Sequence, residues 1–368
     1  MSVATVDEVP ETPAARRGLR ERFLFPLILI GISTLFALVV AEIALRIMGL
    51  GFGHSPLLPD PVFHHVHPRD YHFRLTTPTT KEIVDHDVYY DANGEVADPN
   101  GPHVPASPKY RVALLGDSFM EGNQVLWAEA IGGRLTLSGG DTTQVRNFGV
   151  SSYSPIFYRL QWKKDVADFH PTHVFALMYN NDVRDDTVYG KLAKRDAAGK
   201  VIAVPGPSNA LIPRLMRKSY VLRFAEMMRL KLTWATIHRG RLQRIVGGEV
   251  EENPVIPPAT AEYMRDLARD VEASGAKFVL LAVPSKYRMY NPAAESGPEY
   301  SDRWRAWAAQ NGVTFVDLVA PFKATKGGGK QLFFVHDSHW NAGGHALAAE
   351  TIRANYPELF GARPSRPQ

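Results

Sequence analysis

The chain of 368 residues contains no cysteine, which excludes disulfide bonds and fits an exported protein that needs none. It also lacks a strong excess of either charge. The formal net charge is +4 and the acidic and basic residues are interspersed, so no nucleic-acid-binding surface is indicated. Short-period repeats and low-complexity tracts are absent too. We therefore expect no nucleic acid among the partners of this protein.

Charged side chains are missing from a long N-terminal run, residues 23–41, which is long enough to cross a hydrocarbon layer of ~30 Å as a helix. Four arginines precede this run, whereas only Arg46 follows it closely. This bias predicts that the tail stays in the cytoplasm and the rest of the chain lies outside. We predict a cytoplasmic tail at 1–22 and a single-pass anchor at 23–46 in a bacterial inner (cytoplasmic) membrane, with the remaining chain on the periplasmic side. A signal peptide cleaved near residues 39–41 is the alternative.

The chain beyond the predicted anchor is long enough for one large domain with insertions. Residues 51–108 are rich in proline, histidine and aspartate and are interpreted as a membrane-proximal segment. From 109 to 360, apolar strand-like runs alternate with helix-like stretches. Residues 187–257 interrupt this alternation with a basic, helix-prone run between proline-rich loops, which predicts a helical insertion.

The alternation of strands and helices predicts an α/β fold with a parallel sheet that is covered by helices on both faces. The run 172–178 supports this prediction, because it is almost entirely apolar, as a strand buried on both faces should be. Strands are expected at 112–115, 145–148, 172–178, 277–283 and 314–318, and helices at about 124–137, 155–169, 260–273, 299–311 and 342–355.

Ser118 is the candidate nucleophile, because the run 112–115 ends in Gly-Asp-Ser and strands of such a sheet present reactive groups at their carboxyl ends. A serine hydroxyl is a weak nucleophile and needs a base that a third group orients. His339 is the candidate base and Asp337 its orienter, since both precede the last expected helix. The alternative is that Asp337 caps that helix and His339 is a surface histidine.

An acyl-transfer enzyme also needs hydrogen-bond donors for the oxyanion that forms on the attacked carbonyl. Gly149 follows the second expected strand and can offer a backbone N–H, and Asn181 follows the third and can offer a side-chain amide. The Ser118 N–H would be the third donor. Taken alone, Gly149 could equally be a turn glycine and Asn181 a loop asparagine with local backbone bonds.

These segments, in this order, resemble the SGNH/GDSL hydrolase superfamily. The resemblance extends from about residue 109 to 356, without the middle insertion. It implies a three-layer α/β/α, flavodoxin-like fold in which Ser118, Gly149, Asn181 and His339 mark the four catalytic blocks, with Asp337 completing the triad. It also implies that no metal or organic cofactor is needed.

Two departures from the usual motifs narrow the resemblance. Tyr179 stands where the third block, Gly-x-Asn-Asp, has its glycine, and the last block is Asp337-x-His339 followed by Trp340 instead of Asp-x-x-His. The Asp-x-His-Trp form resembles membrane-anchored and periplasmic branches of the superfamily, which include relatives of the alginate O-acetyltransferases. For such a transferase, the resemblance implies a polytopic membrane acyltransferase as the partner that donates the acyl group.

Lys286 and Tyr287 follow the expected strand 277–283 and are predicted to line the substrate cleft; a surface ion pair is the alternative. A metal site is not predicted. The histidines of the membrane-proximal segment lack helical spacing and a supporting carboxylate pattern: His64, His65, His67 and His72.

The sequence therefore predicts a serine-dependent esterase or O-acyltransferase that acts on acyl, in the first place acetyl, esters of an extracytoplasmic glycan. Water or a sugar hydroxyl would resolve the acyl-enzyme, and the sequence does not separate these two outcomes. The alternative is a catalytically inactive protein of the same fold that binds glycan or assists assembly in an envelope polysaccharide system. An esterase acting on membrane lipids would need an apolar acyl pocket in 187–257, which the sequence does not show.

Overall fold

The computed structural model describes residues 19–48, 57–75, 82–207, 211–225, 228–229, 255–290, 299–335 and 337–361. The chain divides into two compact units, Met1–Gly49 and Leu50–Gln368. The first unit contains helix α1 (Leu19–Met48), whose stretch Phe23–Met48 is long and apolar enough to cross a membrane. Most of the predicted cytoplasmic tail lies outside the described residues.

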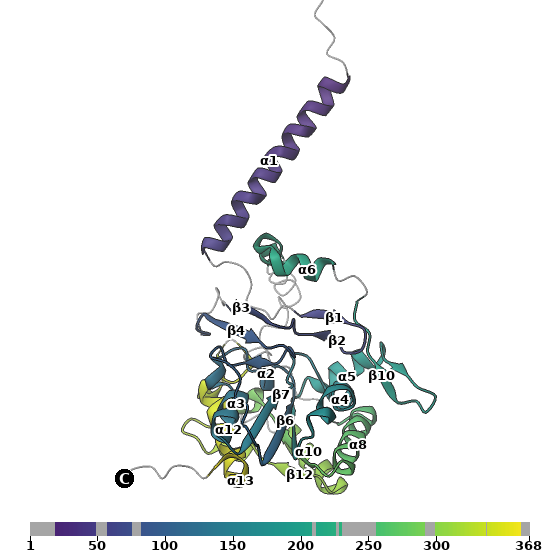
Figure 1. Ribbon diagram of the computed structural model, residues 1–368, viewed down its shortest axis with the longest axis vertical. Coiled ribbons are helices and arrows are strands. Elements are labelled where there is room, and N and C mark those ends of the chain that lie inside the picture. Colours follow the sequence, from purple (N-terminus) through teal and green to yellow (C-terminus); the bar gives the residue numbers. More distant parts are fainter. Residues whose placement is uncertain are drawn as a thin grey trace, which may run out of the picture. The chain divides into compact units, whose positions relative to one another are not determined.

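The second unit is built on a parallel five-stranded sheet in the order β12-β11-β8-β6-β7 (Figure 1). If the five strands are numbered 1 to 5 along the chain and the sheet is followed from β7 to β12, the order is 2-1-3-4-5, which is the order of flavodoxin-like folds. The predicted fold class is confirmed, and each expected strand is present: β6 (Tyr110–Leu115), β7 (Thr143–Asn147), β8 (His173–Met178), β11 (Lys277–Ala282) and β12 (Thr314–Val316).

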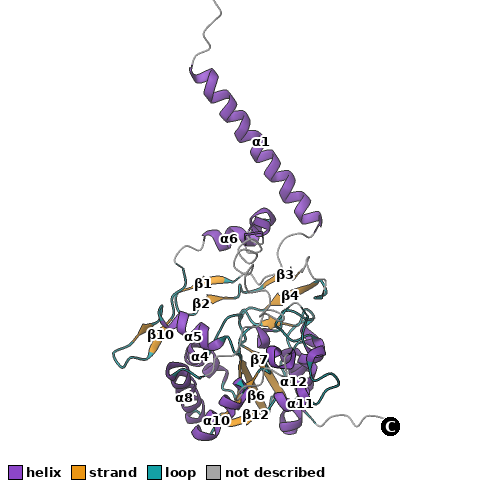
Figure 2. Cartoon of the chain, turned by 180° about the vertical axis from the view of Figure 1, so that it is seen from behind, coloured by secondary structure: helices purple, strands orange, loops and turns teal. Residues whose placement is uncertain are grey.

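Helices cover both faces of this sheet, because alternate residues of each strand point to opposite sides. In β6, Val112 and Leu114 join one buried apolar cluster, whereas Ala113 and Leu115 join the other. Figures 1 and 2 show the two helical layers on either side of the sheet. The first layer contains α3 (Ile131–Gly139), α11 (Val319–Lys323), α12 (Ala342–Asn355) and α13 (Pro357–Phe360), and the second contains α4 (Pro155–Gln161), α8 (Pro258–Ala273) and α10 (Tyr300–Asn311).

One expected helix begins later than predicted. The pattern at 124–137 predicts a single helix after Ser118, but the chain forms a short helix α2 (Ser118–Glu121) first and begins α3 only at Ile131. Gly122 ends α2 because it adopts a left-handed conformation with φ of 70°, which a glycine reaches at little cost. The expected helix 342–355 coincides with α12.

The segment before β6 folds into small antiparallel sheets that belong to the same compact unit. A third apolar cluster joins Phe73 and Val88 of this segment to Val125 and Phe334 of the α/β part. Its strands are β1 (Leu58–Asp60), β2 (His64–Val66), β3 (Tyr71–Leu75), β4 (His86–Tyr90) and β5 (Val96–Ala97).

Within the predicted insertion, the structure describes a strand pair and a helix, and much of the remaining insertion, 230–254 included, lies outside the described residues. These elements are β9 (Lys194–Arg195), β10 (Val201–Ala203) and α6 (Leu211–Lys218); α5 (Asp182–Gly190), which follows β8, overlaps its start. The predicted domain boundaries stay a prediction.

Candidate active site

Ser118 is the first residue of α2, directly beyond the carboxyl end of β6. Asp117 caps this helix, since its Oδ1 accepts a hydrogen bond of 2.9 Å from the Phe119 N–H. Gly116 is needed at the turn, because a Cβ there would lie only 2.5 Å from Met120 Cβ. The serine thus lies where strand order reverses between β6 and β8, the place at which open α/β sheets bind ligands.

The structure brings Ser118, His339 and Asp337 together in one relay. His339 Nε2 lies 2.7 Å from Ser118 Oγ, and His339 Nδ1 lies 2.5 Å from Asp337 Oδ1. Asp337 Oδ1 also accepts a hydrogen bond of 2.8 Å from the His339 backbone N–H, which helps to fix the carboxylate beside the imidazole ring. A carboxylate can only accept, so Nδ1 carries a proton and Nε2 of the neutral ring can accept the serine proton.

The charges of the relay shift both pKa values. Burial by itself lowers the pKa of His339, but the attraction of Asp337 and its hydrogen bond outweigh burial and raise this pKa above 6.5. Burial by itself raises the pKa of Asp337, but the attraction of His339 and hydrogen bonds from it bring this pKa down to about 2. Asp337 therefore stays ionised at neutral pH, and its charge makes His339 bind a proton more readily than burial alone would allow.

The other two oxyanion donors predicted from the sequence, the Gly149 N–H and the Asn181 amide, each donate a hydrogen bond to an acceptor within the protein. The Gly149 N–H donates to Asn147 Oδ1 at 3.0 Å, and Asn181 Nδ2 donates to Asp185 Oδ2 at 3.0 Å. Among the described hydrogen bonds, none uses the Ser118 N–H. The oxyanion role of Gly149 and Asn181 stays a prediction. It requires the Gly149 N–H to turn from Asn147, whereas the Asn181 amide has a second N–H beside the one that Asp185 accepts.

Gly149 nevertheless packs directly against the helix that carries the serine. A Cβ at this position would lie 2.6 Å from the Glu121 backbone nitrogen, closer than any side chain could come. Asn147 also binds α2, since its Nδ2 donates a hydrogen bond of 2.8 Å to Met120 O. The end of β7 and helix α2 therefore form one closely packed edge of the site.

Tyr179, the departure in the third motif, supports the histidine through Phe119. The Phe119 ring centroid lies 4.5 Å from that of Tyr179 and 4.9 Å from that of His339. The Tyr179 backbone N–H donates to Asp182 Oδ2 at 2.8 Å, so the turn after β8 is closed without a glycine. An aromatic side chain at this position thus fills the space beneath the relay.

The sequence predicts that Lys286 lines the substrate cleft, but the structure buries this side chain completely. Its Nζ donates to the carbonyl oxygens of Phe334, Val335 and Asp337 at 2.6, 3.0 and 2.7 Å. These carbonyls belong to the loop that carries Asp337 and His339. The position of Lys286, at the start of α9 (Lys286–Tyr290), therefore supports a role in holding this loop and does not support a contact with substrate. Tyr287 is half-buried, and its contact with substrate stays a prediction.

Glu121 is a buried residue of the site that the sequence analysis missed. It lies one turn after Ser118, its Oε1 lies 2.8 Å from His67 Nε2, and Tyr90 donates to the same oxygen at 3.1 Å. Its Oε2 accepts the Ser151 N–H at 2.7 Å. Burial alone raises the pKa of Glu121, but the attraction of His67 and the hydrogen bonds from His67 and Ser151 outweigh burial and lower it. The only signal in the sequence was an acidic residue three positions after the serine.

Comparison with known proteins places the C-terminal part of the chain in a specific context. Residues 249–366 match the model of a family described as the SGNH hydrolase-like domain of the acetyltransferase AlgX. Two curated relatives named "Probable alginate O-acetylase AlgJ" are similar: one from Pseudomonas syringae pv. tomato, 33% identical over 28% of this chain, and one from Pseudomonas fluorescens, 33% identical over 22%. This chain spans about a quarter of their lengths, 27% and 22%.

Solved structures of low sequence identity are also similar. They include LAE5, an alpha/beta hydrolase from the metagenome of Lake Arreo in Spain, with 15% identity, a TM-score of 0.41 and coverage of 70% of this chain and 99% of that one. A catalytic mutant of the acetylxylan esterase Axe2 from Geobacillus stearothermophilus has 13% identity, a TM-score of 0.38 and coverage of 72% and 100%. With the family match and the curated relatives, the predicted resemblance to SGNH hydrolases of the alginate O-acetyltransferase kind is confirmed.

Proposed function

We propose that this protein is a membrane-anchored serine esterase or O-acyltransferase that acts on acetyl esters of an extracytoplasmic glycan. The observation that carries the proposal is the relay from Ser118 Oγ through His339 to Asp337, with distances of 2.7 and 2.5 Å. Such a relay is the arrangement that activates a serine for acyl transfer.

In this mechanism, His339 Nε2 takes the proton of Ser118 as Oγ attacks the ester carbonyl. The resulting oxyanion would be held by the Ser118 and Gly149 N–H groups and the Asn181 amide, after the Gly149 N–H leaves Asn147 Oδ1. Collapse of the tetrahedral intermediate breaks the ester bond, and the protonated His339 gives its proton to the departing alcohol. Water or a sugar hydroxyl then attacks the acyl-enzyme, and His339 takes the proton of this second nucleophile. Collapse of the second tetrahedral intermediate breaks the bond between the acyl group and Ser118 Oγ, and His339 returns the proton to Oγ.

The substrate class and location rest on other observations. The curated relatives are named as alginate O-acetylases, which supports a polysaccharide as the acyl donor or acceptor. Helix α1 supports a single-pass anchor, and the four arginines before the apolar run 23–41 support a periplasmic catalytic unit at the inner membrane. As a transferase, the protein would receive its acyl group from a polytopic membrane acyltransferase.

A non-catalytic glycan-binding role is the second candidate, and one observation favours it. The Gly149 N–H is engaged with Asn147 Oδ1, so this part of the oxyanion site is not preformed. Activity of the serine distinguishes the two candidates.

The test is hydrolysis of p-nitrophenyl acetate by the full-length protein in detergent, with Ser118→Ala beside it. Loss of a triad nucleophile should lower kcat/KM by about a thousandfold or more. Ser274→Ala, which removes a hydroxyl beyond the end of α8, is the matched control and should keep the wild-type rate. Equal, background rates for wild type and Ser118→Ala, together with no labelling of Ser118 by a phosphonate, would favour the binding role.

A further inference from the structure

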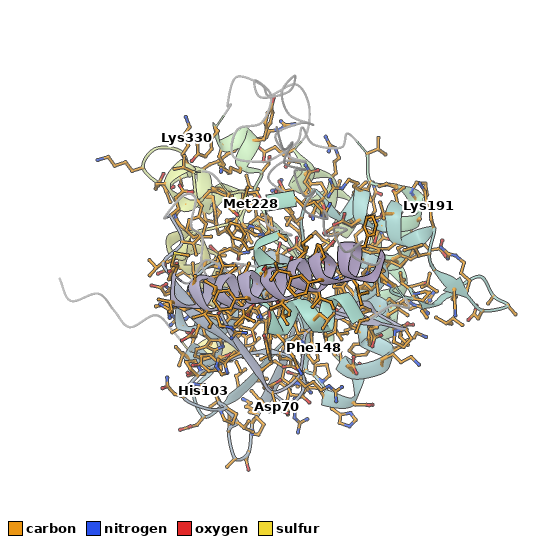
Figure 3. All side chains as sticks on the ribbon, turned by 90° about the horizontal axis from the view of Figure 1, so that it is seen from above. Asp70, His103, Phe148, Lys191, Met228 and Lys330 are labelled. Carbon is orange, nitrogen blue, oxygen red and sulfur yellow. The ribbon has the colours of Figure 1, made fainter. Side chains whose placement is uncertain are left out.

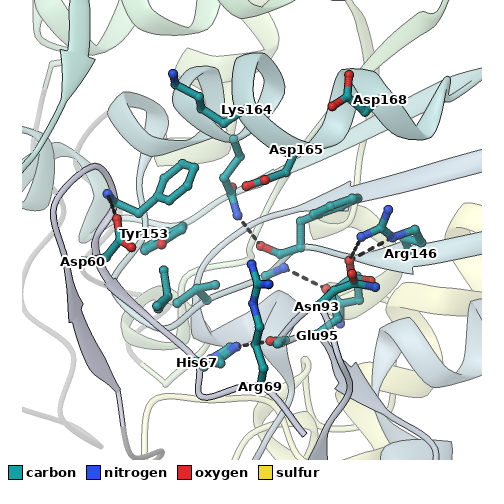
Figure 4. A pocket seen from close by; sticks show the side chains of 18 residues that line it. Asp60, His67, Arg69, Asn93, Glu95, Arg146, Tyr153, Lys164, Asp165 and Asp168 are labelled. Atoms are coloured by element: carbon teal, nitrogen blue, oxygen red, sulfur yellow. Dashed lines mark hydrogen bonds and ion pairs between the residues drawn. The ribbon is translucent and has the colours of Figure 1, made fainter.

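Two adjoining cavities form one groove along β7, the edge strand of the parallel sheet. Their volumes are about 390 and 540 Å³, and their linings share Asn93, Glu95, Arg146 and Asn147. Figure 4 shows the smaller cavity, and Figure 3 shows Phe148 of the smaller lining on the same side of the unit as Asp70 and His103 of the larger. We call this continuous depression the edge groove.

The edge groove reaches the helix that carries the serine. Gly149 and Asn147 line it, and both contact α2 directly, through the close approach of Gly149 to Glu121 and the hydrogen bond from Asn147 to Met120 O. Its wall also includes His67, which pairs with the buried Glu121 of α2. Neither lining includes Ser118 or His339, so a long molecule in this groove would lie along the edge of the sheet beside α2, with Gly149 between it and the serine helix.

The lining combines flat aromatic surfaces with hydrogen-bonding groups. Tyr89 and Trp127 of the larger cavity are half-buried, and His72 and His103 stack on their rings, whereas Phe148 and Tyr153 of the smaller cavity are buried. Amides, carboxylates and guanidinium groups lie between them. Arg69 extends into the smaller cavity in Figure 4. Aromatic side chains with nearby polar groups suit a ligand that is apolar on the faces of its rings and polar at their edges, as a sugar chain is.

Acidic residues predominate in this lining. The larger cavity has Asp70, Asp91, Glu95 and Asp98 against one base, Arg146. The smaller adds Asp60, Asp165 and Asp168 against Arg69 and Lys164. With histidine neutral, the described lining carries seven carboxyl groups and three basic groups, a formal excess of four negative charges. Burial raises the pKa of Glu95 to about 7 and also raises the pKa of Asp165, and protonation of both groups still leaves an acidic groove.

We propose that the edge groove binds the glycan part of the substrate as an uncharged chain and discriminates against polyuronates. The inference rests on the proposed function and adds the charge class of its substrate. Negative groups along the groove repel a ligand that carries one carboxylate per sugar, whereas they can accept hydrogen bonds from the hydroxyls of a neutral chain. The specificity of this chain would then differ from that named for its alginate-modifying relatives.

The test compares two hexasaccharides that differ only at C6, β-1,4-mannohexaose and β-1,4-hexamannuronate. Binding is measured by calorimetry on the full-length Ser118→Ala protein in detergent, so that turnover does not interfere. At low salt the neutral chain should bind at least about tenfold more tightly, because like charges oppose the uronate. Added salt should narrow this gap by improving uronate binding, since it screens the repulsion.

Reversing the charge of groove residues tests whether the discrimination against the uronate arises in the groove. In the same background, Asp165→Lys combined with Asp168→Lys removes the formal negative excess and should strengthen hexamannuronate binding by about tenfold at low salt. Asp141→Lys makes the same kind of change on an exposed residue before β7, outside both linings, and should change this binding by less than about twofold. If the lysine variant does not fold, Asp165→Asn with Asp168→Asn should produce an intermediate gain.

Tighter binding of the uronate than of the neutral chain, or no binding of either, would overturn the groove proposal. So would an equal response of the Asp165/Asp168 and Asp141 variants. None of these binding results affects the p-nitrophenyl acetate assay. A wild-type enzyme that hydrolyses p-nitrophenyl acetate but binds the uronate more tightly would refute only the proposed charge class of the substrate. A wild-type protein that is inactive, and whose Ser118 a phosphonate does not label, would instead refute the proposed function.

Discussion

Among single residues, His339 decides the pH range in which the relay can work. The ring must be neutral to accept the serine proton, and Asp337 holds its pKa above 6.5 despite burial. We therefore expect the rate of p-nitrophenyl acetate hydrolysis to rise with pH through the pKa of His339.

Asp337→Asn tests this coupling. The substitution removes the carboxylate that raises the pKa of His339, so burial then dominates and the acid limb of the rate profile should move to lower pH. The rate at the plateau should fall by about a thousandfold to ten-thousandfold, because the amide no longer holds the ring in the productive tautomer. A pH profile of kcat/KM measures both effects, and an acid limb that stays in place would contradict the pairing.

Lys286 is the second residue whose role can be measured. Lys286→Met leaves three carbonyls of the loop 334–337 without their donor, so we expect kcat to fall by about tenfold to a hundredfold through displacement of His339, with KM nearly unchanged. Lys330→Met is the matched control, since Lys330 is exposed, as Figure 3 shows. A rise in KM with an unchanged kcat would instead restore the contact with substrate predicted from the sequence.

At the scale of elements, α2 has only four residues and depends on its surroundings for its position. Glu121 connects it to β4 through Tyr90, to His67 beyond β2, and to the loop after β7 through Ser151. The antiparallel sheets before the α/β part thus help to hold the helix of the nucleophile.

Glu121→Gln should lower the free energy of unfolding by about 3–5 kcal/mol at neutral pH, because it leaves His67 buried without its charged partner. The pKa of Glu121 is lowered in the folded state, so its contribution is present above the ordinary carboxyl range and is lost as pH falls through the folded pKa. Urea unfolding at two pH values measures this effect. Glu129→Gln, outside the pair, is the control, and equal losses for the two variants would refute the role of the pair.

At the scale of the whole molecule, the chain separates into an apolar helix and a compact unit with its own core. Deletion of residues 1–49 should move the protein from the membrane fraction to the soluble fraction and leave p-nitrophenyl acetate hydrolysis within about twofold of wild type, since every residue of the relay lies in the second unit. Fractionation and the same assay test this expectation. A deletion variant that stays with the membrane would show that another segment binds lipid.

The sequence alone was sufficient to predict those features that depend on residues close together in the chain. Apolar runs, the helix-like stretches between them and the Gly-Asp-Ser and Asp-x-His segments determined the α/β class, the resemblance and the candidate relay, because strand and helix periodicity and strand-end residues are properties of neighbouring positions. The start of α3 was misplaced because the backbone is extended at Leu126 and Ala130, on either side of a short 3-10 turn, and the apolar pattern does not show these breaks.

Only the tertiary structure decided what the buried polar groups contact. The sequence predicts that Lys286 lines the substrate cleft, yet the three acceptors of its side chain lie about fifty residues later. The partners of Glu121 come from residues 67, 90 and 151. A charged group inside a protein must be paired, and which groups pair depends on how distant segments pack rather than on local pattern. The acidic edge groove has the same origin, since its carboxylates come from four separate stretches of chain that only folding brings to one edge of the sheet.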